Sequence, residues 1–152
     1  MRRSLILIII VIAALGAREL ALTGMAIAAN FEPVIVERVI DGDTVVLSNG
    51  ERVRLMGIDT PEKGEYLFEE AKQWLQRIEG QQVVLETGDE DRDKYGRLLR
   101  YIHWNGLVEE EILKQGLAKV FMLEPHEKHY EELISAEALA IEAGIGLWNS
   151  TL

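Results

Sequence analysis

The sequence predicts an α+β fold in which five short strands close into a β-barrel with three helices, preceded by a hydrophobic leader. Segments rich in β-branched residues alternate with turn residues through the first half of the chain, and helical spacing appears after the third and fifth of these segments. A chain of 152 residues, 48% of them hydrophobic, can bury the core of one such domain. The absence of cysteine excludes disulfides and thiolate metal sites.

The leader is separate from this fold. Two arginines precede residues 4–17, which are almost wholly apolar, and residues 26–28 (Ala-Ile-Ala) have the pattern that a signal peptidase cleaves. The uncharged run is shorter than the roughly 20 residues that span a bilayer comfortably. We therefore interpret residues 1–29 as a signal peptide or membrane anchor and assign residues 30–152 to the domain. We expect an exported protein, either secreted or attached to the envelope membrane through residues 4–29.

The first half of the domain reads as a β-meander. β-Branched residues at 33–40 and 44–47 predict two strands, joined by the turn Asp-Gly-Asp at 41–43. An Asn-Gly pair at 49–50 predicts a hairpin. Alternation of charged and apolar residues then predicts a third strand over 52–58.

Helices and two more strands follow. Apolar residues at helical spacing predict a helix over 67–78, which ends at Gly80. Residues 82–86 and 98–104 predict the fourth and fifth strands, with a polar loop at 87–94. This order is the layout of an oligonucleotide/oligosaccharide-binding (OB) barrel, a fold that hosts many functions. The last two predicted elements are helices at 108–115 and 126–143.

Carboxylates gather at two turns of the meander. Asp41 and Asp43 precede the second strand, and Asp59 ends the third. Because the start of one strand of a hairpin lies beside the end of the other, Asp43 and Asp59 are expected to be neighbours. Close carboxylates repel unless a cation lies between them, and hard cations such as Ca²⁺ prefer several oxygen ligands, including backbone carbonyls such as that of Thr60. Either motif alone is more commonly an ordinary turn, since Asp, Gly and Pro are the usual turn residues.

Two arginines accompany these acids. Arg54 lies within the third strand, and Arg97 starts the fifth after the turn Lys-Tyr-Gly at 94–96. A guanidinium group suits bidentate contact with phosphate, so two arginines and a divalent cation would stabilise a charge-rich transition state. For either arginine alone, a surface ion pair is an equal alternative.

Together these segments resemble the staphylococcal nuclease-like (thermonuclease) family, and the resemblance covers about residues 33–149. A single matching motif is a weak signal, whereas five in register are a strong one. The segments that carry it are 40–45 (Ile-Asp-Gly-Asp-Thr-Val), Arg54 with 58–62 (Ile-Asp-Thr-Pro-Glu), 93–97 (Asp-Lys-Tyr-Gly-Arg), 115–120 (Gln-Gly-Leu-Ala-Lys-Val) and 146–148 (Gly-Leu-Trp).

The resemblance implies a metal site and a general base. Asp43 and Asp59 would bind Ca²⁺ through their carboxylates and Thr60 through its carbonyl, with Asp41 in a supporting position. Glu62 would act through water, as the general base or as the group that orients the attacking water. The ligand types alone do not choose among Ca²⁺, Mg²⁺ and Mn²⁺.

The resemblance also implies the substrate. Arg54 and Arg97 would clamp the scissile phosphate, and Lys94 and Tyr95 would contact a neighbouring one. Family members hydrolyse single-stranded or frayed DNA and RNA at the P–O5′ bond and leave 3′-phosphates.

Two features favour an alternative, a non-catalytic, envelope-anchored barrel that binds nucleic acid or protein. The formal net charge is −10 and becomes −12 without residues 1–29, whereas nucleic-acid binders are usually basic. In addition, residues 121–125 (Phe-Met-Leu-Glu-Pro) replace the tyrosines that flank the base in the typical family nuclease. Phe121 either stacks on a base or packs in the core.

The remaining candidates are interpreted as structural. His126 and His129 lack the His-Glu-x-x-His spacing of zinc sites, and a third ligand is not evident, so we interpret them as the surface start of the last helix. The acidic run at 109–111 suits the positive end of a helix dipole. Tyr101 and the three tryptophans are expected to pack in the barrel.

Overall fold

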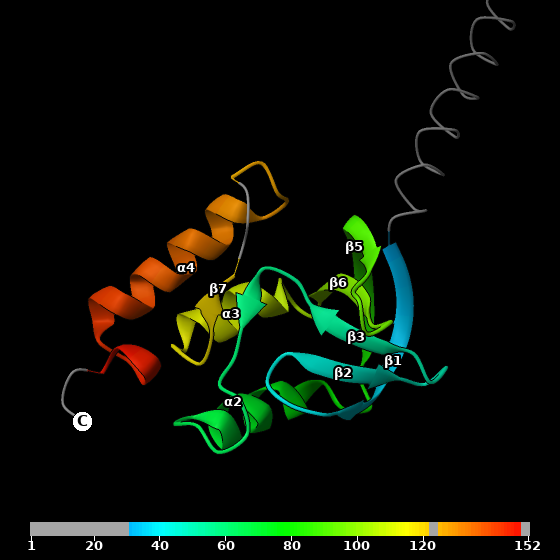
Figure 1. Cartoon of the computed structure of the whole chain (residues 1–152), viewed down its shortest axis with the longest axis horizontal. Coiled ribbons are helices and arrows are strands. Elements are labelled where there is room, and N and C mark those ends of the chain that lie inside the picture. Colours follow the sequence, from blue (N-terminus) through cyan, green and yellow to red (C-terminus); the bar gives the residue numbers. More distant parts are fainter. Residues whose placement is uncertain (1–30, 122–124, 150–152) are drawn as a thin grey trace, which may run out of the picture. The chain divides into compact units, whose positions relative to one another are not determined.

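A computed structural model describes residues 31–121 and 125–149 (Figure 1), so the leader predicted at residues 1–29 lies outside the described part. Among the described helices, none has the length and apolar character needed to cross a bilayer. The predicted fold class is confirmed, since five strands close into one barrel and three α-helices accompany it in this part of the chain. The barrel strands are β1 (Phe31–Val39), β2 (Thr44–Leu47), β3 (Arg52–Leu55), β5 (Gln82–Arg92) and β6 (Leu98–His103).

The barrel combines antiparallel and parallel pairs. The strand order is β1-β2-β3-β6-β5, and β3 with β6 is the parallel pair. In that pair Val53 lies opposite Leu98 and Arg54 opposite Leu99. Arg97, which directly precedes β6, therefore lies beside the strand that carries Arg54, although 43 positions separate the two arginines in the sequence.

The third predicted strand is broken in two. Gly57 has φ 72°, which L side chains rarely adopt, and the chain turns there. Beyond the turn, β4 (Ile58–Asp59) leaves the barrel and pairs with β7 (Lys119–Val120). The predicted loop at 87–94 is also partly wrong, because β5 continues to Arg92. There β5 pairs with β6 again, after an irregularity in the register.

The three helices are α2 (Phe68–Leu75), α3 (Val108–Lys114) and α4 (Tyr130–Ala143). Helix α4 starts four positions later than predicted, because His129 has a left-handed backbone with φ 60°. Figure 1 shows α4 running alongside α3, and the two helices are in contact. The segment that follows α3 contacts the segment that follows α4 at two glycines, Gly116 and Gly146. Leu147 N–H donates to Gly116 O over 2.8 Å, and a Cβ at either glycine would clash with the opposite backbone. The segments 115–120 and 146–148, which both carry the family resemblance, therefore contact each other.

The acidic residue Glu109 lies buried in the core and contacts Ile102. Glu109 in the first turn of α3 has no solvent exposure, and both of its carboxylate oxygens accept the backbone N–H of Ile102, at 3.1 and 3.3 Å. The helix-dipole interpretation of residues 109–111 does not account for this burial. Burial raises the pKa of Glu109 well above its ordinary value, and the charge of Glu86 adds to the effect.

We expect Glu109→Gln to stabilise the protein at neutral pH. Because the folded-state pKa is raised, native Glu109 retains a proton that the unfolded chain loses above pH 4.5. Its contribution to stability is therefore complete below that pH and is lost as pH rises toward the raised pKa. Glutamine keeps the shape and does not ionise, so the free energy of unfolding at pH 7 should be higher than that of wild type, and the difference should grow with pH above 4.5.

Urea unfolding between pH 4 and 8, followed by tryptophan fluorescence, measures this difference. Glu110→Gln, at the next and partly exposed position, is the matched control and should follow the wild-type pH profile. A Glu109→Gln profile that falls with pH as steeply as wild type would contradict the assignment of the buried proton.

Candidate functional site

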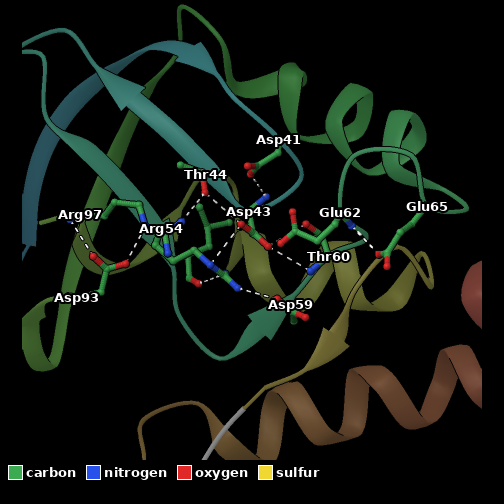
Figure 2. Close-up of polar contacts among 11 residues, drawn as sticks. Asp41, Asp43, Thr44, Arg54, Asp59, Thr60, Glu62, Glu65, Asp93 and Arg97 are labelled. Atoms are coloured by element: carbon green, nitrogen blue, oxygen red, sulfur yellow. Dashed lines mark hydrogen bonds and ion pairs between the residues drawn. The ribbon is translucent and has the colours of Figure 1, made fainter. Parts of the chain in front are cut away.

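The site is built where the turn before β2 meets the end of β4. The Asp43 side chain is buried, and its Oδ2 accepts the backbone N–H of Thr60 over 3.1 Å and the Thr60 hydroxyl over 2.8 Å (Figure 2). The hairpin between β2 and β3 brings these two turns together, as expected from the Asn-Gly pair. Asp59, by contrast, points outward, with 58% of its side chain exposed.

Gly42 is required by close packing in this turn. A Cβ at this position would lie 2.7 Å from Thr60 Oγ1 and 2.8 Å from the Cβ of Ala71 on α2. Real Cβ atoms do not approach so closely, so any side chain here would push Thr60 away from Asp43. The glycine of the Asp-Gly-Asp motif therefore holds the two turns in contact.

Arg54 lies between the two carboxylates. Its Nε is 3.3 Å from Asp43 Oδ1 and its terminal nitrogen is 3.0 Å from Asp59 Oδ1 (Figure 2), while a third nitrogen donates to the carbonyl of Leu55 over 2.7 Å. Only 14% of the Arg54 side chain is exposed. The guanidinium group therefore supplies the positive charge that keeps these two acids together.

Asp41 adds a further acid to this cluster. Its Oδ1 accepts the backbone N–H of Asp43 over 3.2 Å. Burial raises the pKa of Asp41, and the negative charge of Asp43 raises it further. This crowding of oxygen ligands around partly buried carboxylates fits a hard divalent cation, which would relieve the repulsion between them.

Arg97 is connected to the same cluster through residues that the sequence analysis did not single out. Its Nε donates to Asp93 Oδ2 over 2.7 Å, and its terminal nitrogen donates to Thr44 Oγ1 over 3.3 Å. The Thr44 hydroxyl donates in turn to Asp43 Oδ1 over 3.1 Å. Although burial opposes it, the hydrogen bonds from Arg97 lower the pKa of Asp93 and keep it ionised. The Asp-x-x-Gly turn was a signal for Asp93. Both Asp93 and Thr44 also belong to segments that carry the family resemblance, although neither was assigned a role there.

The other predicted residues lie at the rim. Tyr95 is 65% exposed at the turn between β5 and β6, and its ring lies 5.1 Å from Lys94 Nζ and 5.6 Å from the Arg97 guanidinium carbon. Glu62 is exposed, and its backbone N–H donates to Glu65 over 2.7 Å. In Figure 2 the Glu62 side chain extends toward Asp43. The structure thus places Tyr95 beside Arg97, Lys94 beside Tyr95, and Glu62 near Asp43.

A cavity of about 470 Å³ adjoins this cluster, and both arginines line it. Tyr101 and Lys128 form part of its wall, and Phe121 does so with 61% of its surface exposed. The interpretation of Phe121 as a core residue is therefore wrong. An aromatic face is available to a planar group beside the two guanidinium groups.

Comparison with known proteins connects this geometry to one family. The family model described as staphylococcal nuclease homologue matches residues 52–150. The thermonuclease of Staphylococcus intermedius is 33% identical over 129 residues, which are 77% of this chain and 76% of the relative. The thermonuclease of Staphylococcus hyicus is 31% identical over 134 residues, 80% and 79% respectively. Endonuclease YncB of Bacillus subtilis is 34% identical over 131 residues, 78% of this chain and 62% of the relative.

The ion pairs of Arg54 predict opposite effects of two substitutions on Ca²⁺ binding. If Asp59 is a Ca²⁺ ligand as predicted from the sequence, Asp59→Asn should weaken Ca²⁺ binding by about tenfold or more, because ligand charge tunes affinity at such sites. Arg54→Gln removes a cation that contacts both carboxylates and should tighten binding by about tenfold in the absence of nucleotide. Calorimetric titration of the full-length chain with Ca²⁺ measures both changes.

The control for this experiment is Asp91→Asn. Asp91 pairs with Arg100 through an exposed carboxylate and makes no contact with the Arg54 carboxylates among the described interactions. The Asp91→Asn variant should bind Ca²⁺ with the same affinity as wild type. Weaker Ca²⁺ binding by Arg54→Gln would show that the guanidinium group does not compete for these ligands.

Proposed function

The chain belongs to the staphylococcal nuclease family, and from this premise we propose that it is a Ca²⁺-dependent nuclease of single-stranded or frayed DNA and RNA. One observation carries the proposal. Arg54 and Arg97 line a single cavity and both connect to the carboxylate cluster around Asp43. Two phosphate-binding side chains beside a hard-cation ligand set are what phosphodiester hydrolysis requires.

The metal would be held by the oxygen ligands already described. Asp43 and Asp59 offer carboxylates and Thr60 offers its carbonyl, while Asp41 supports Asp43 through the turn. Bound there, a divalent cation supplies positive charge that polarises the phosphate and offsets its charge in the transition state. We propose Ca²⁺ because exposed Asp59 and the surrounding turns leave room for several oxygen ligands in loose geometry.

The arginines would hold the scissile phosphate. Arg54 now contacts Asp59, and substrate binding would transfer that guanidinium nitrogen to a phosphate oxygen. Arg97 is preoriented by Asp93 and Thr44, and its remaining N–H groups would bind the phosphate. Lys94 and Tyr95, on the adjoining turn, would contact the neighbouring phosphate.

Glu62 would accept the proton of the attacking water or fix its orientation. It is exposed beside the turn at Thr60, so water has access to its carboxylate. Attack by this water with departure of the 5′-oxygen would leave a 3′-phosphate. The P–O5′ bond is the one that breaks in this scheme.

Because the protein carries a net negative charge, substrate binding would depend on the charges close to the cavity. The formal net charge is −10, and the cavity wall combines Arg54, Arg97 and Lys128 with four acidic residues, Asp89, Glu90, Asp93 and Glu127. Long-range attraction of a polyanion is therefore weak, and binding would depend on short-range contacts that salt screens strongly. A single strand can reach such a recess more readily than a stiff duplex.

We also propose that residues 4–29 export the protein or tether it to the membrane. The basic start and apolar run support this placement. External protease added to intact cells should degrade the domain if the proposal is right, and a protected domain would contradict it.

The nuclease proposal is tested with single-stranded DNA and the full-length chain, first with Ca²⁺ and then with chelator. We expect chelator-sensitive cleavage to 3′-phosphate products. Arg97→Ala should lower kcat by about 100- to 1,000-fold, as loss of a transition-state donor does. Glu62→Gln should lower it by about 100- to 10,000-fold, because a general base is lost.

Arg77→Ala is the matched control for Arg97→Ala. Arg77 is exposed, its guanidinium carbon lies 5.4 Å from the Trp74 ring centroid, and it does not line the cavity, so its loss should leave kcat nearly unchanged. Binding of DNA without chelator-sensitive cleavage would establish the alternative, a non-catalytic binding module.

A further inference from the structure

A second group of metal-ligating side chains lies where β5, β6 and the start of α4 meet. Glu86 belongs to β5, His103 ends β6, and His129 directly precedes α4. The Nε2 atoms of both histidines lie 2.8 Å from the same oxygen, Oε2 of Glu86. All three ligand atoms lie within 4.8 Å of one another. The sequence analysis found no complete ligand set for His129, whereas the structure places Glu86 and His103 next to it. His126 is exposed and does not belong to this group.

The arrangement has the composition of a zinc site. Two imidazole nitrogens and one carboxylate oxygen are a recurrent Zn²⁺ ligand set that leaves a fourth position for water. At Zn–ligand bonds of about 2.1 Å, tetrahedral ligand atoms lie about 3.4 Å apart. The two 2.8 Å separations would thus have to open by about 0.6 Å, and the two imidazole nitrogens already lie within 4.8 Å of each other. Glu86 is mostly buried, whereas both histidines are partly exposed, so an ion can enter from solvent.

Neighbouring groups hold His129 in the required orientation. Its ring packs edge-on against Tyr101 at 4.7 Å, and the Tyr101 hydroxyl donates to the carbonyl of Lys128 over 2.8 Å. This bond fixes the left-handed turn that presents His129. The other ring nitrogen, Nδ1, lies 3.8 Å from Glu132 Oε1. A carboxylate at that nitrogen is the usual outer partner of a zinc-bound histidine.

One charge opposes metal binding. Lys128 Nζ lies 3.3 Å from Glu86 Oε1, the oxygen that the histidines do not contact, and it donates to the carbonyl of Thr87 over 2.8 Å. Without a metal this ammonium group neutralises Glu86. With a metal it would remain on the second oxygen and reduce the affinity by repulsion.

We propose that Glu86, His103 and His129 form a Zn²⁺ site separate from the oxygen-ligand site of Asp43 and Asp59. The ion would connect β5, β6 and the start of α4, three elements that are distant in the sequence. Zinc binding would therefore stabilise the attachment of α4 to the barrel. Because Tyr101 and Lys128 also line the cavity, the ion would support one wall of it.

The test is calorimetric titration of Zn²⁺ into the full-length chain, prepared without a histidine tag and with Ca²⁺ saturating the oxygen-ligand site. We expect one Zn²⁺ per chain, a higher Tm, and, with Co²⁺ as the probe, the visible absorption of a tetrahedral complex. His103→Gln and His129→Gln should each weaken Zn²⁺ binding by more than about 100-fold. This loss exceeds the roughly 10- to 100-fold effect of removing a residue that only hydrogen-bonds to a metal ligand. His126→Gln, which changes the remaining histidine of the sequence, should bind as wild type does.

Two results would overturn the proposal: no stoichiometric Zn²⁺ binding by wild type, or equal binding by all three histidine variants. Where a histidine variant fails to fold, Lys128→Gln decides, since it keeps every ligand and removes the opposing ammonium group. It should bind Zn²⁺ several-fold more tightly than wild type. Unchanged or weaker binding by Lys128→Gln would also overturn the proposal.

Discussion

The parallel pairing of β3 with β6 is the constraint on which the site depends. Hairpins join segments that are close in sequence, and the β2–β3 hairpin brings only the two acidic turns together. The parallel pair brings in Arg97 from 43 positions beyond Arg54. The carboxylate cluster around Asp43 and the two arginines consequently lie together on a small barrel, with Thr44 as the hydrogen-bonded link between them.

Charge balance explains why so many acids can gather on that side. Arg54 contacts two carboxylates and Arg97 contacts a third, so each arginine is positioned by the acids that it neutralises. A similar balance exists at Glu86, where Lys128 and two histidines surround one carboxylate. In both places N–H groups of the protein's own side chains contact its carboxylates, and a bound metal ion, as proposed above, would take over part of that role.

The sequence was sufficient to predict the barrel, its hairpin and the neighbouring acidic turns, because these depend on local patterns. It could not predict the break at Gly57 or the extension of β5 to Arg92, since each depends on which partner strand is available. The contact between Glu86 and His103 depends on register: Val84 lies opposite His103, which makes Glu86 its diagonal neighbour. The irregularity in this pairing between Thr87 and Arg92 leaves that register unspecified in the sequence, because the turn alone does not set it.

The contact between Gly116 and Gly146 limits when the domain can fold. The segment after α3 is closed by backbone from the segment after α4, and Leu147 N–H completes the junction. Synthesis must therefore pass Leu147 before the packing of α3 is finished. A fragment that stops before Gly146 lacks the backbone that closes this junction, so it cannot complete the packing of the segment after α3.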